Sequence, residues 1–332
     1  MPNIIISNNC NLKCQYCFAD NMISSNDSNK FINYDSFSKI LNWLAKDPNC
    51  QEQIGIIGGE PTLHPMFNNI ITVLNDYCKQ MGCDALIFTN GIELKRYLSH
   101  LGENIGVLLN CNSPKFQSKE SYKKFLDTLY TAASLGMIEN DKIRCGCNIY
   151  LGLNDYSYFW NDIVDIVHPK IIRCSVVCPG GCYQKEWKHQ NKKEEYYKLL
   201  KSSFMEFVEN AIKRKVILSL DCNQIPYCYF SDEERQKILN VIEFTPTTVC
   251  KPAVDINSNL EVSSCFGTYD IDKENKKILI TDFKNVNELR DYLFFSKNVP
   301  KIEKNNGGQC NECDFYKMKQ CQGGCLSFVD KL

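Results

Sequence analysis

The chain has 332 residues, enough for two domains, or for one large domain with an appendage, and for a sizeable hydrophobic core. Its 38 Lys and Arg residues balance 39 Asp and Glu residues, for a net charge of -1, so the composition indicates no basic surface for nucleic acid. The first apolar run, Ile4 to Ile6, is too short for a signal peptide, and no run approaches the ~20 residues of a membrane span.

Cysteine is unusually frequent, with 20 residues in the chain. In a small secreted protein this number would suggest disulfide bonds. In a long chain without a signal peptide it favours metal ligands and a reducing compartment. We therefore expect a cytoplasmic protein that has neither nucleic acid nor membrane as a partner.

The first predicted strand, Asn3 to Ser7, runs into a loop with three cysteines at C-x-x-x-C-x-x-C spacing: Cys10, Cys14 and Cys17. Three thiolates on one loop can bind one face of a [4Fe–4S] cluster and leave the fourth iron open. On spacing alone, a zinc knuckle with a distant fourth ligand and three unrelated core cysteines remain alternatives.

The second predicted strand, Ile54 to Ile57, ends in a short motif that reads Gly58-Gly59-Glu60-Pro61. Glycines at a strand end let the backbone approach a ligand closely. The carboxylate of Glu60 can accept hydrogen bonds from a bound amino group. This motif therefore predicts a small-molecule site beside the cysteine loop.

Together, C-N-L-K-C-Q-Y-C-F and G-G-E-P resemble the motifs of the radical S-adenosylmethionine (SAM) enzymes. The resemblance implies a [4Fe–4S] cluster on Cys10, Cys14 and Cys17, whose open iron chelates the methionine part of SAM. An electron from the cluster then releases a 5'-deoxyadenosyl radical, which abstracts hydrogen from the substrate. It further implies an electron donor such as flavodoxin or ferredoxin. The cofactor-binding residues that it implies are Phe18 at the adenine and, at the methionine amino group, Gly58, Gly59, Glu60 and Pro61.

Four more strands follow the first two and alternate with amphipathic helices, the first of which is predicted to start at Asp35 as its N-cap. Such alternation predicts a parallel sheet with right-handed crossovers. Six units make a partial (β/α)6 barrel, with its chemistry at the carboxyl ends of the strands. The predicted strands are Asp84 to Phe88, Ile105 to Leu109, Ile143 to Leu151 and Lys170 to Val177; the later helices are Met66 to Met81, Glu93 to Leu101, Tyr122 to Leu135 and Tyr156 to Val167.

Polar residues follow the third and fourth predicted strands. Thr89-Asn90-Gly91 is either a tight turn or part of the barrel mouth, where the family often has this tripeptide. The family also has polar residues after the fourth strand that bind the ribose, commonly serine and aspartate. Asn110 and Asn112 stand there in this sequence, which preserves hydrogen bonding but removes the charge.

The sixth predicted strand leads into C-S-V-V-C-P-G-G-C, with Cys174, Cys178 and Cys182. Its Pro-Gly-Gly turn places Cys178 and Cys182 near the barrel mouth, where they could supply a reactive thiol or a cluster ligand. The plainer interpretation is that they are small buried residues in a cysteine-rich chain. The sequence leaves this choice open.

After a charged helix, Lys193 to Lys213, and a short strand, Val216 to Leu220, the composition changes. We place a boundary there, between a barrel domain of residues 1–215 and a cysteine-rich domain of residues 216–332. Alternating residues around an Asn-Ser-Asn turn predict a β-hairpin between Cys250 and Cys265. Ordered cysteines in this domain indicate metal ligation: Cys222, Cys228, Cys250, Cys265, Cys310, Cys313, Cys321 and Cys325.

This cysteine-rich region resembles the SPASM extension of radical SAM enzymes, which carries auxiliary iron–sulfur clusters. The match is partial: seven residues separate Cys313 from Cys321 where five are usual, Leu260 stands at the family's glycine, and no cysteine follows Cys325. We expect two auxiliary [4Fe–4S] clusters, with a zinc ribbon as the alternative.

Two ligand arrangements fit these cysteines. In the segregated arrangement, Cys222, Cys228, Cys250 and Cys265 hold one cluster, and the last four cysteines hold the other. In the interleaved arrangement, Cys325 joins Cys250, Cys265 and either Cys222 or Cys228, and one cluster keeps an open iron. The C-Q-G-G-C spacing favours the interleaved arrangement.

The resemblance favours an enzyme that modifies a peptide or protein side chain, by a thioether or carbon–carbon crosslink or by oxidation. The alternative enzyme is a radical SAM dehydrogenase of a sugar or cyclitol. It is favoured by a first strand at Asn3, which leaves no room for an N-terminal leader-binding domain. An iron–sulfur electron carrier or zinc-binding module is the non-enzyme alternative, and the G-G-E-P strand end argues against it.

Overall fold

The structure is a computed structural model of the whole chain. It describes 11 segments, to which all structural statements below refer: residues 1–17, 19–20, 30–46, 52–179, 185–187, 189–221, 225–243, 249–251, 253–268, 277–305 and 310–329. The predicted adenine contact Phe18 and the predicted ligand Cys222 lie outside these segments, as does Cys182.

One curved sheet of ten strands organises the described chain, in the order β10-β9-β8-β1-β2-β3-β4-β5-β6-β7. All neighbours from β8 through β7 pair in parallel. The first six strands confirm the predicted partial barrel: β1 Pro2–Ser7, β2 Ile54–Gly58, β3 Ala85–Thr89, β4 Ile105–Asn110, β5 Ile143–Ile149 and β6 Ile171–Val176. The short strand expected after residue 215, β7 (Ile217–Leu220), continues the same sheet beside β6.

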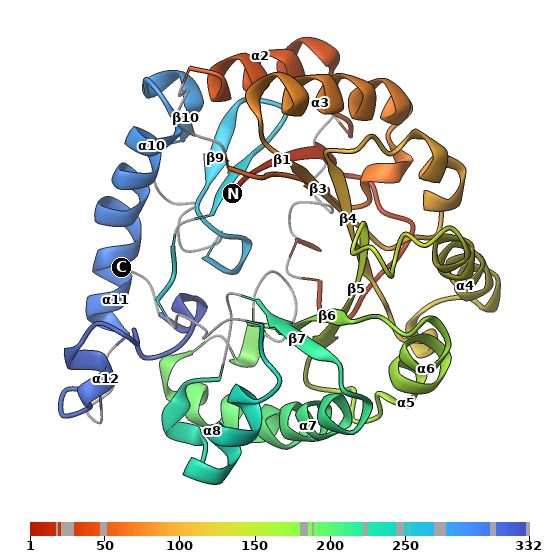
Figure 1. Cartoon of the computed structure of the whole chain (residues 1–332). Helices are drawn as coiled ribbons and strands as arrows, with labels where there is room; N and C mark the ends of the chain where they lie inside the picture. The colour runs from red at the N-terminus through yellow and green to blue at the C-terminus, as the bar shows by residue number, and fades with distance from the viewer. Residues whose placement is uncertain are drawn as a thin grey trace.

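Helices surround the outside of the curved sheet (Figure 1). Along the barrel they are α2 Tyr34–Leu44, α3 Phe67–Met81, α4 Lys119–Ser134, α5 Ser157–Phe159, α6 Asp165–Val167, α7 Lys193–Arg214 and α8 Asp232–Leu239. Toward the C-terminus they are α10 Val286–Leu293, α11 Val299–Lys304 and α12 Asp314–Lys317. Helices α10 and α11 cover the side between β1 and β7, where the barrel strands leave the ring open (Figure 1).

The sheet crosses the predicted domain boundary. Strand β8 (Val254–Ile256) pairs in parallel with β1. It also forms the predicted hairpin with β9 (Glu261–Ser263), to which β10 (Ile278–Leu279) adds a third antiparallel strand. The division at residues 215 and 216 therefore falls within one continuous sheet, just before β7.

The hairpin turn supports the alignment with the SPASM pattern. Leu260, which stands where that pattern has glycine, has φ 63°. This left-handed conformation is the one that glycine adopts at no steric cost and that a leucine side chain disfavours. The backbone thus has the shape that the family's glycine would allow, although the residue differs.

Alternation along the strands builds the core. Fully buried residues such as Ile4 and Ile6 in β1, and Val107 and Leu109 in β4, pack under the helices. The intervening positions include glycines, asparagines and arginines and face the opposite side of the sheet, because side chains alternate along a strand. The residues that face the helices form the hydrophobic core, and the residues of the opposite face are available for a polar site.

Three local predictions need correction. Asn33, and not Asp35, caps α2: its side chain accepts a hydrogen bond of 2.8 Å from the Ser36 backbone. The helix expected from Glu93 to Leu101 is a 3-10 helix, Leu94–His100. The helix expected from Tyr156 to Val167 contains a π-helical segment, Trp160–Val164, between α5 and α6. Periodicity detects the buried face of such segments but not how tightly the backbone is wound.

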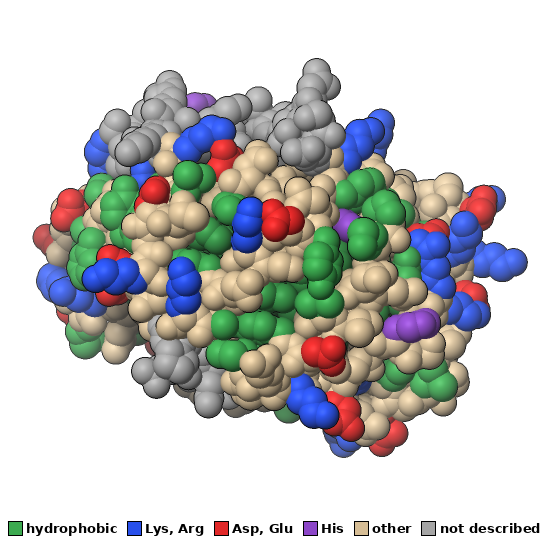
Figure 2. All heavy atoms as spheres, turned by 90° about the horizontal axis from the view of Figure 1, so that it is seen from above, with side chains coloured by type: hydrophobic (Ala, Val, Ile, Leu, Met, Phe, Trp, Pro, Cys, Tyr) green, Lys and Arg blue, Asp and Glu red, His purple; other side chains and the backbone are tan. Residues whose placement is uncertain are grey.

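In the part of the chain that the structure describes, no helix combines the length and apolar character needed to cross a membrane. Lysine, arginine and acidic side chains are interspersed on the face drawn in Figure 2, with hydrophobic side chains between them.

Candidate functional site

The cysteine loop is attached to the G-G-E strand end by backbone hydrogen bonds. The N–H of Gly59 donates to the carbonyl of Ser7, and the N–H of Glu60 donates to that of Asn9, both at 2.7 Å. A Cβ at Gly58 would lie 2.2 Å from the Ser7 oxygen, and one at Gly59 would lie 2.5 Å from the Asn9 oxygen. The two glycines are therefore required for the loop to sit on β2.

The three loop thiols are partly buried and lie close enough to influence one another. Burial raises the pKa of Cys10 to about 11 and, reinforced by charges on Cys10 and Cys17, raises that of Cys14 to about 12. Burial also raises the pKa of Cys17. Thiols held protonated in this way would release protons on binding iron, because only the thiolate is a ligand. The donor set fits a three-cysteine cluster.

A mononuclear site fits these residues less well. Within the described segments, no three His, Cys, Asp or Glu side chains converge closely enough to hold a single metal ion. Sulfurs that share one Zn²⁺ lie about 3.8 Å apart, because each Zn–S bond is about 2.3 Å long. A cubane binds each thiolate at a different iron, so its cysteines stand further apart.

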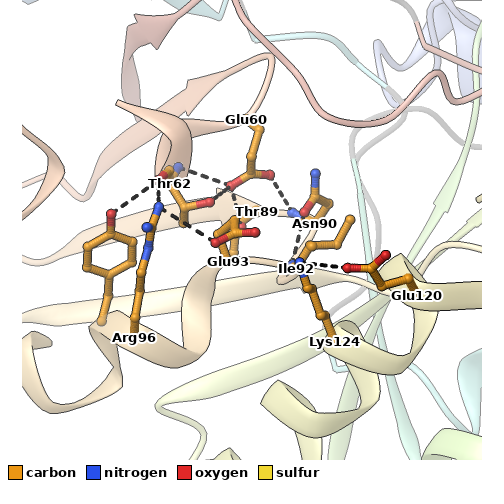
Figure 3. Close-up of polar contacts among 10 residues, drawn as sticks. Glu60, Thr62, Thr89, Asn90, Ile92, Glu93, Arg96, Glu120 and Lys124 are labelled. Atoms are coloured by element: carbon orange, nitrogen blue, oxygen red, sulfur yellow. Dashed lines mark hydrogen bonds and ion pairs between the residues drawn. The ribbon is translucent and has the colours of Figure 1, made fainter. Parts of the chain in front are cut away.

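Glu60 is the centre of a buried hydrogen-bond network at the ends of β2 and β3 (Figure 3). Its Oε1 accepts from the hydroxyls of Thr62 and Thr89, each at 2.6 Å, and from the Thr62 backbone at 3.1 Å. Its Oε2 accepts from the backbone N–H of Asn90 at 2.8 Å. Glu60 is only 1% exposed, so it has a structural role that the sequence did not predict.

The environment of Glu60 has two opposing effects. Burial raises its pKa, while the hydrogen bonds from Asn90, Thr62 and Thr89 oppose that rise. A carboxylate has about four lone-pair positions on its two oxygens. Oε1 accepts three of these hydrogen bonds and Oε2 accepts one, so Oε2 retains capacity for a donor on a ligand.

Thr89-Asn90-Gly91 is both a turn and part of the site. Gly91 has φ 78°, as a left-handed turn position requires. The Asn90 side chain donates 2.7 Å to the Asn11 side chain of the cysteine loop and accepts from the Ile92 backbone at 3.1 Å. The tripeptide thus connects the third strand to both the cysteine loop and Glu60.

Tyr16, which lies between Cys14 and Cys17, was not singled out from the sequence and is the main contact of the cysteine loop with β4 and β5. Its hydroxyl donates to Asn112 Oδ1 and accepts from Asn148 Nδ2 at 3.0 Å. Its ring lies against that of Tyr150, with centroids 4.6 Å apart. An aromatic residue inside the cysteine motif was the signal that could have identified it.

The two predicted ribose residues lie at the end of β4. Asn110 is half-buried, and its backbone carbonyl accepts from the Asn112 side chain at 3.2 Å. Asn112 is 8% exposed, and its Oδ1 also lies 3.7 Å from the Cys14 sulfur. Asn112 is therefore adjacent to the cysteine loop, with part of its hydrogen-bonding capacity already used.

Charged residues on and after the later strands also face the inside of the barrel. Arg173 of β6 donates to Asn148 at 2.9 Å and pairs with Asp221. Through Asn148 and Tyr16, a continuous hydrogen-bonded chain connects Arg173 with Asn112 at the cysteine loop. The barrel interior is thus polar up to the cysteines.

No disulfide bond joins any of the 17 cysteines that the structure describes. The C-terminal cysteines form two neighbourhoods. Burial, reinforced by repulsion from Cys325, raises the pKa values of Cys250 and Cys265, so these three lie together as in the interleaved arrangement. The pKa of Cys228 is instead raised by burial and by charges on Cys321, Cys310 and Cys313, a grouping that neither arrangement anticipated.

Comparison with known proteins identifies the barrel. Residues 4–167 match the sequence family described as the radical SAM superfamily. Among curated relatives, the radical SAM cyclopropyl synthase TigE of Paramaledivibacter caminithermalis is 28% identical over 182 residues, which are 49% of this chain and 37% of TigE. GTP 3',8-cyclase of Synechocystis is 27% identical over 161 residues, 47% of each protein. The chain thus spans less than half the length of these relatives.

Solved structures share the fold over nearly the entire chain. Streptococcus suis SuiB bound to S-adenosylmethionine has a TM-score of 0.64 and 15% identity, covering 97% of this chain and 72% of SuiB. The structure of anSMEcpe with bound AdoMet and the Kp18Cys peptide has a TM-score of 0.62 and 17% identity, covering 99% of this chain and 90% of anSMEcpe. At this identity the likeness concerns the fold, and it includes the C-terminal region.

Proposed function

Since the chain belongs to the radical SAM superfamily, we propose that it cleaves S-adenosylmethionine reductively and abstracts a hydrogen atom from a peptide or protein side chain. The observation that carries the proposal is the cysteine loop, which is pinned by backbone hydrogen bonds onto Gly59 and Glu60. That contact brings a three-thiol ligand set against a glycine-lined strand end, as an iron-bound amino acid would require.

Each part of the site has a role in this proposal. Cys10, Cys14 and Cys17 hold a [4Fe–4S] cluster, which supplies the electron that converts SAM into methionine and the 5'-deoxyadenosyl radical. The thiols give up their protons on cluster binding. The hydrogen bonds at Ser7 and Asn9 fix where the loop presents the cluster.

The SAM site extends from the β2 end to the β4 end. Gly58, Gly59, Glu60 and Pro61 receive the methionine amino group, with Glu60 Oε2 as the acceptor beside its bond from Asn90. Asn110 and Asn112 receive the ribose hydroxyls from the end of β4. We retain Phe18 as the proposed adenine contact.

The choice of a peptide substrate is supported by the whole-chain likeness in fold to SuiB and anSMEcpe, both of which have solved structures with a bound peptide. The GTP 3',8-cyclases match only about half of this chain. They favour the alternative that the substrate is a small molecule, as for a sugar or cyclitol dehydrogenase.

The rest of the proposal concerns the region after residue 215. We propose that residues 216–332 hold two auxiliary [4Fe–4S] clusters, that residues 1–215 carry the SAM chemistry, and that a flavodoxin or ferredoxin supplies electrons. The described cysteines form no disulfide bond, which is consistent with a reducing cytoplasm, where such clusters are assembled.

Isotope transfer tests the proposal. The reconstituted protein is incubated without oxygen with SAM, a reductant and either fully deuterated peptide pools or deuterated sugars and cyclitols. Deuterium in 5'-deoxyadenosine from peptides alone supports the proposal, and transfer from sugars or cyclitols alone selects the alternative. Absence of 5'-deoxyadenosine under every condition contradicts both.

A further inference from the structure

The loop that follows β6 belongs to the same neighbourhood as the C-terminal cysteines, although it is more than seventy residues earlier in the chain than Cys250. Two adjacent tyrosines of α7 hold the two segments. The Tyr196 hydroxyl donates 2.6 Å to the carbonyl of Val177. The Tyr197 hydroxyl accepts 2.8 Å from the backbone N–H of Cys325.

Gly267 shows how closely the thiols approach. A Cβ added there would lie 3.0 Å from the sulfur of Cys178, 3.6 Å from that of Cys265 and 3.4 Å from Cβ of Ser327. The Ser327 hydroxyl is in turn 3.2 Å from the sulfur of Cys325. Three cysteines from three separate segments therefore surround one small region beside Gly267.

Cys250 belongs to the same region. Its backbone N–H donates 2.7 Å to the Gln322 side chain, which donates 2.8 Å back to the Cys250 sulfur. The same Gln322 amide also donates 3.1 Å to the carbonyl of Gly324, the residue directly before Cys325.

The second neighbourhood is built around Gly323. Its N–H donates 3.4 Å to the sulfur of Cys321, and a Cβ added to it would lie 3.5 Å from the sulfur of Cys310. Cys228 approaches the same group, because the ring of Tyr227, its neighbour in the chain, stacks on the ring of Phe315, two residues after Cys313, with centroids 6.0 Å apart. Cys228 lies shortly after β7, at the start of the cysteine-rich region, whereas the other three cysteines lie near its end.

We propose that the two auxiliary clusters are each held by four cysteines, one set of which includes a barrel residue: Cys178 with Cys250, Cys265 and Cys325, and Cys228 with Cys310, Cys313 and Cys321. This inference rests on the proposed function for the presence of auxiliary clusters. It replaces the open-iron arrangement favoured by the sequence, since Cys228 and Cys178 each supply a fourth thiolate to their set.

Full ligation has a chemical consequence. A [4Fe–4S] cluster with four thiolate ligands presents no open iron. Neither auxiliary cluster then binds substrate through iron, and both are restricted to electron transfer. Ligation by Cys178 also ties the end of β6 to the C-terminal region by iron–sulfur bonds.

The test uses full-length protein in which Cys10, Cys14 and Cys17 are all alanine, so that the remaining iron reports on the auxiliary clusters alone. We expect about eight irons per chain. Adding Cys178→Ala should abolish or alter one cluster signal in electron paramagnetic resonance, the same one that Cys325→Ala affects. Adding Cys228→Ala should affect the other. Cys174→Ala, four residues earlier on β6 and buried in the core, should leave both signals intact.

A second measurement does not depend on whether a variant folds. The protein without any substitution is alkylated before and after chelation of its iron, and the modified cysteines are identified by mass spectrometry. Cys178 and Cys228 should become reactive on chelation together with the other six proposed ligands. Unchanged spectra in Cys178→Ala, or equal reactivity of Cys178 with and without iron, would overturn the inference.

These outcomes are separable from the proposed function. If the inference is wrong, the proposed SAM cleavage by the Cys10 cluster still stands. Conversely, if the protein does not cleave SAM but Cys178→Ala still removes one auxiliary-cluster signal, the proposed function is contradicted and the inference stands. A triple-alanine protein with no iron, or with zinc in its place, contradicts the inference and the auxiliary clusters of the proposed function together.

Discussion

The hydroxyl of Thr89 donates a 2.6 Å hydrogen bond to Oε1 of Glu60 and so joins the ends of β2 and β3 directly beneath the cysteine loop. The carboxylate that is proposed to receive the SAM amino group is therefore also a buried structural acceptor. The structural role predicts a loss of stability when Glu60 is removed, and the ligand-binding role predicts a loss of SAM affinity.

Glu60→Ala should reduce both stability and SAM affinity. Its removal leaves the hydroxyls of Thr62 and Thr89 and the N–H of Asn90 without their acceptor, which should cost roughly 2–4 kcal/mol in unfolding free energy. Loss of a charged hydrogen bond to the ligand should weaken SAM binding ~10-fold or more. Chemical denaturation and calorimetric titration measure the two effects.

Glu93→Ala is the matched control, because Glu93 lies in the same region and pairs with Arg96 at 3.7 Å (Figure 3). It should change neither quantity appreciably. A folded Glu60→Ala protein with an unchanged SAM dissociation constant would show that Glu60 is structural only.

Tyr16→Phe should retain iron but weaken the ligand site. The ring contact with Tyr150 is preserved, whereas the hydroxyl that bridges Asn112 and Asn148 is lost. We expect a loss of about 1 kcal/mol in stability and a severalfold decrease in SAM affinity, because Asn112 is no longer held in place. Tyr130→Phe, which removes an exposed hydroxyl bound to the Asp162 carbonyl, is the control. Loss of iron in Tyr16→Phe would mean that Tyr16 positions the thiols instead.

Asp255 should make the protein less stable as the pH rises. Burial raises its pKa to about 6, despite a 2.6 Å hydrogen bond from Asn3. Because the folded-state value lies above the unfolded value of about 3.9, the stabilising contribution is complete below about pH 4 and is lost as the pH passes about 6. The difference between these two pKa values corresponds to a loss of about 3 kcal/mol.

Asp255→Asn should remove this dependence and raise the unfolding free energy at pH 7. The expected readout is a difference between variant and wild type that grows from pH 5 to pH 7.5 in urea denaturation. Asp35→Asn, at an exposed carboxylate paired with Lys39, provides the comparison. A pH-independent difference would place the Asp255 carboxyl at its ordinary pKa.

The corrected helix cap gives a further test. Asn33→Ala should destabilise the protein by about 1 kcal/mol, because the Ser36 N–H loses its acceptor. Asp35→Ala should cost less, about 0.5 kcal/mol, since it removes only an exposed ion pair near the helix start. A larger effect at Asp35 in thermal denaturation would restore the cap predicted from the sequence.

The sequence was informative wherever a local pattern determines structure. Strands β1 to β6 were predicted to within about two residues, because alternating apolar residues such as Val107 and Leu109 are typical of a strand with one buried face. The Cys10 loop and Gly58-Gly59 were found because a ligand set and a close backbone approach each require particular residues at fixed spacing. The hairpin after Cys250 was found through its Asn-Ser-Asn turn.

Long-range relationships were not predictable in the same way. The pairing of β8 with β1 and the approach of Cys178 to Cys265 bring together segments separated by many residues, and no local pattern encodes either. The buried network of Glu60 depends on Thr89 from another strand. Tyr16 is an exception, because its place between two ligands was visible and its contacts were not.

Cys14→Ala provides the most direct test of the central claim. Wild-type protein and this variant are reconstituted with iron and sulfide, reduced without oxygen and mixed with SAM, and 5'-deoxyadenosine is quantified. Cys78→Ala, which removes a buried thiol on α3 outside the site, is the control. We expect formation by wild type and Cys78→Ala and background levels from Cys14→Ala, because two cysteines cannot hold the cluster in place. Undiminished formation by Cys14→Ala would contradict the account.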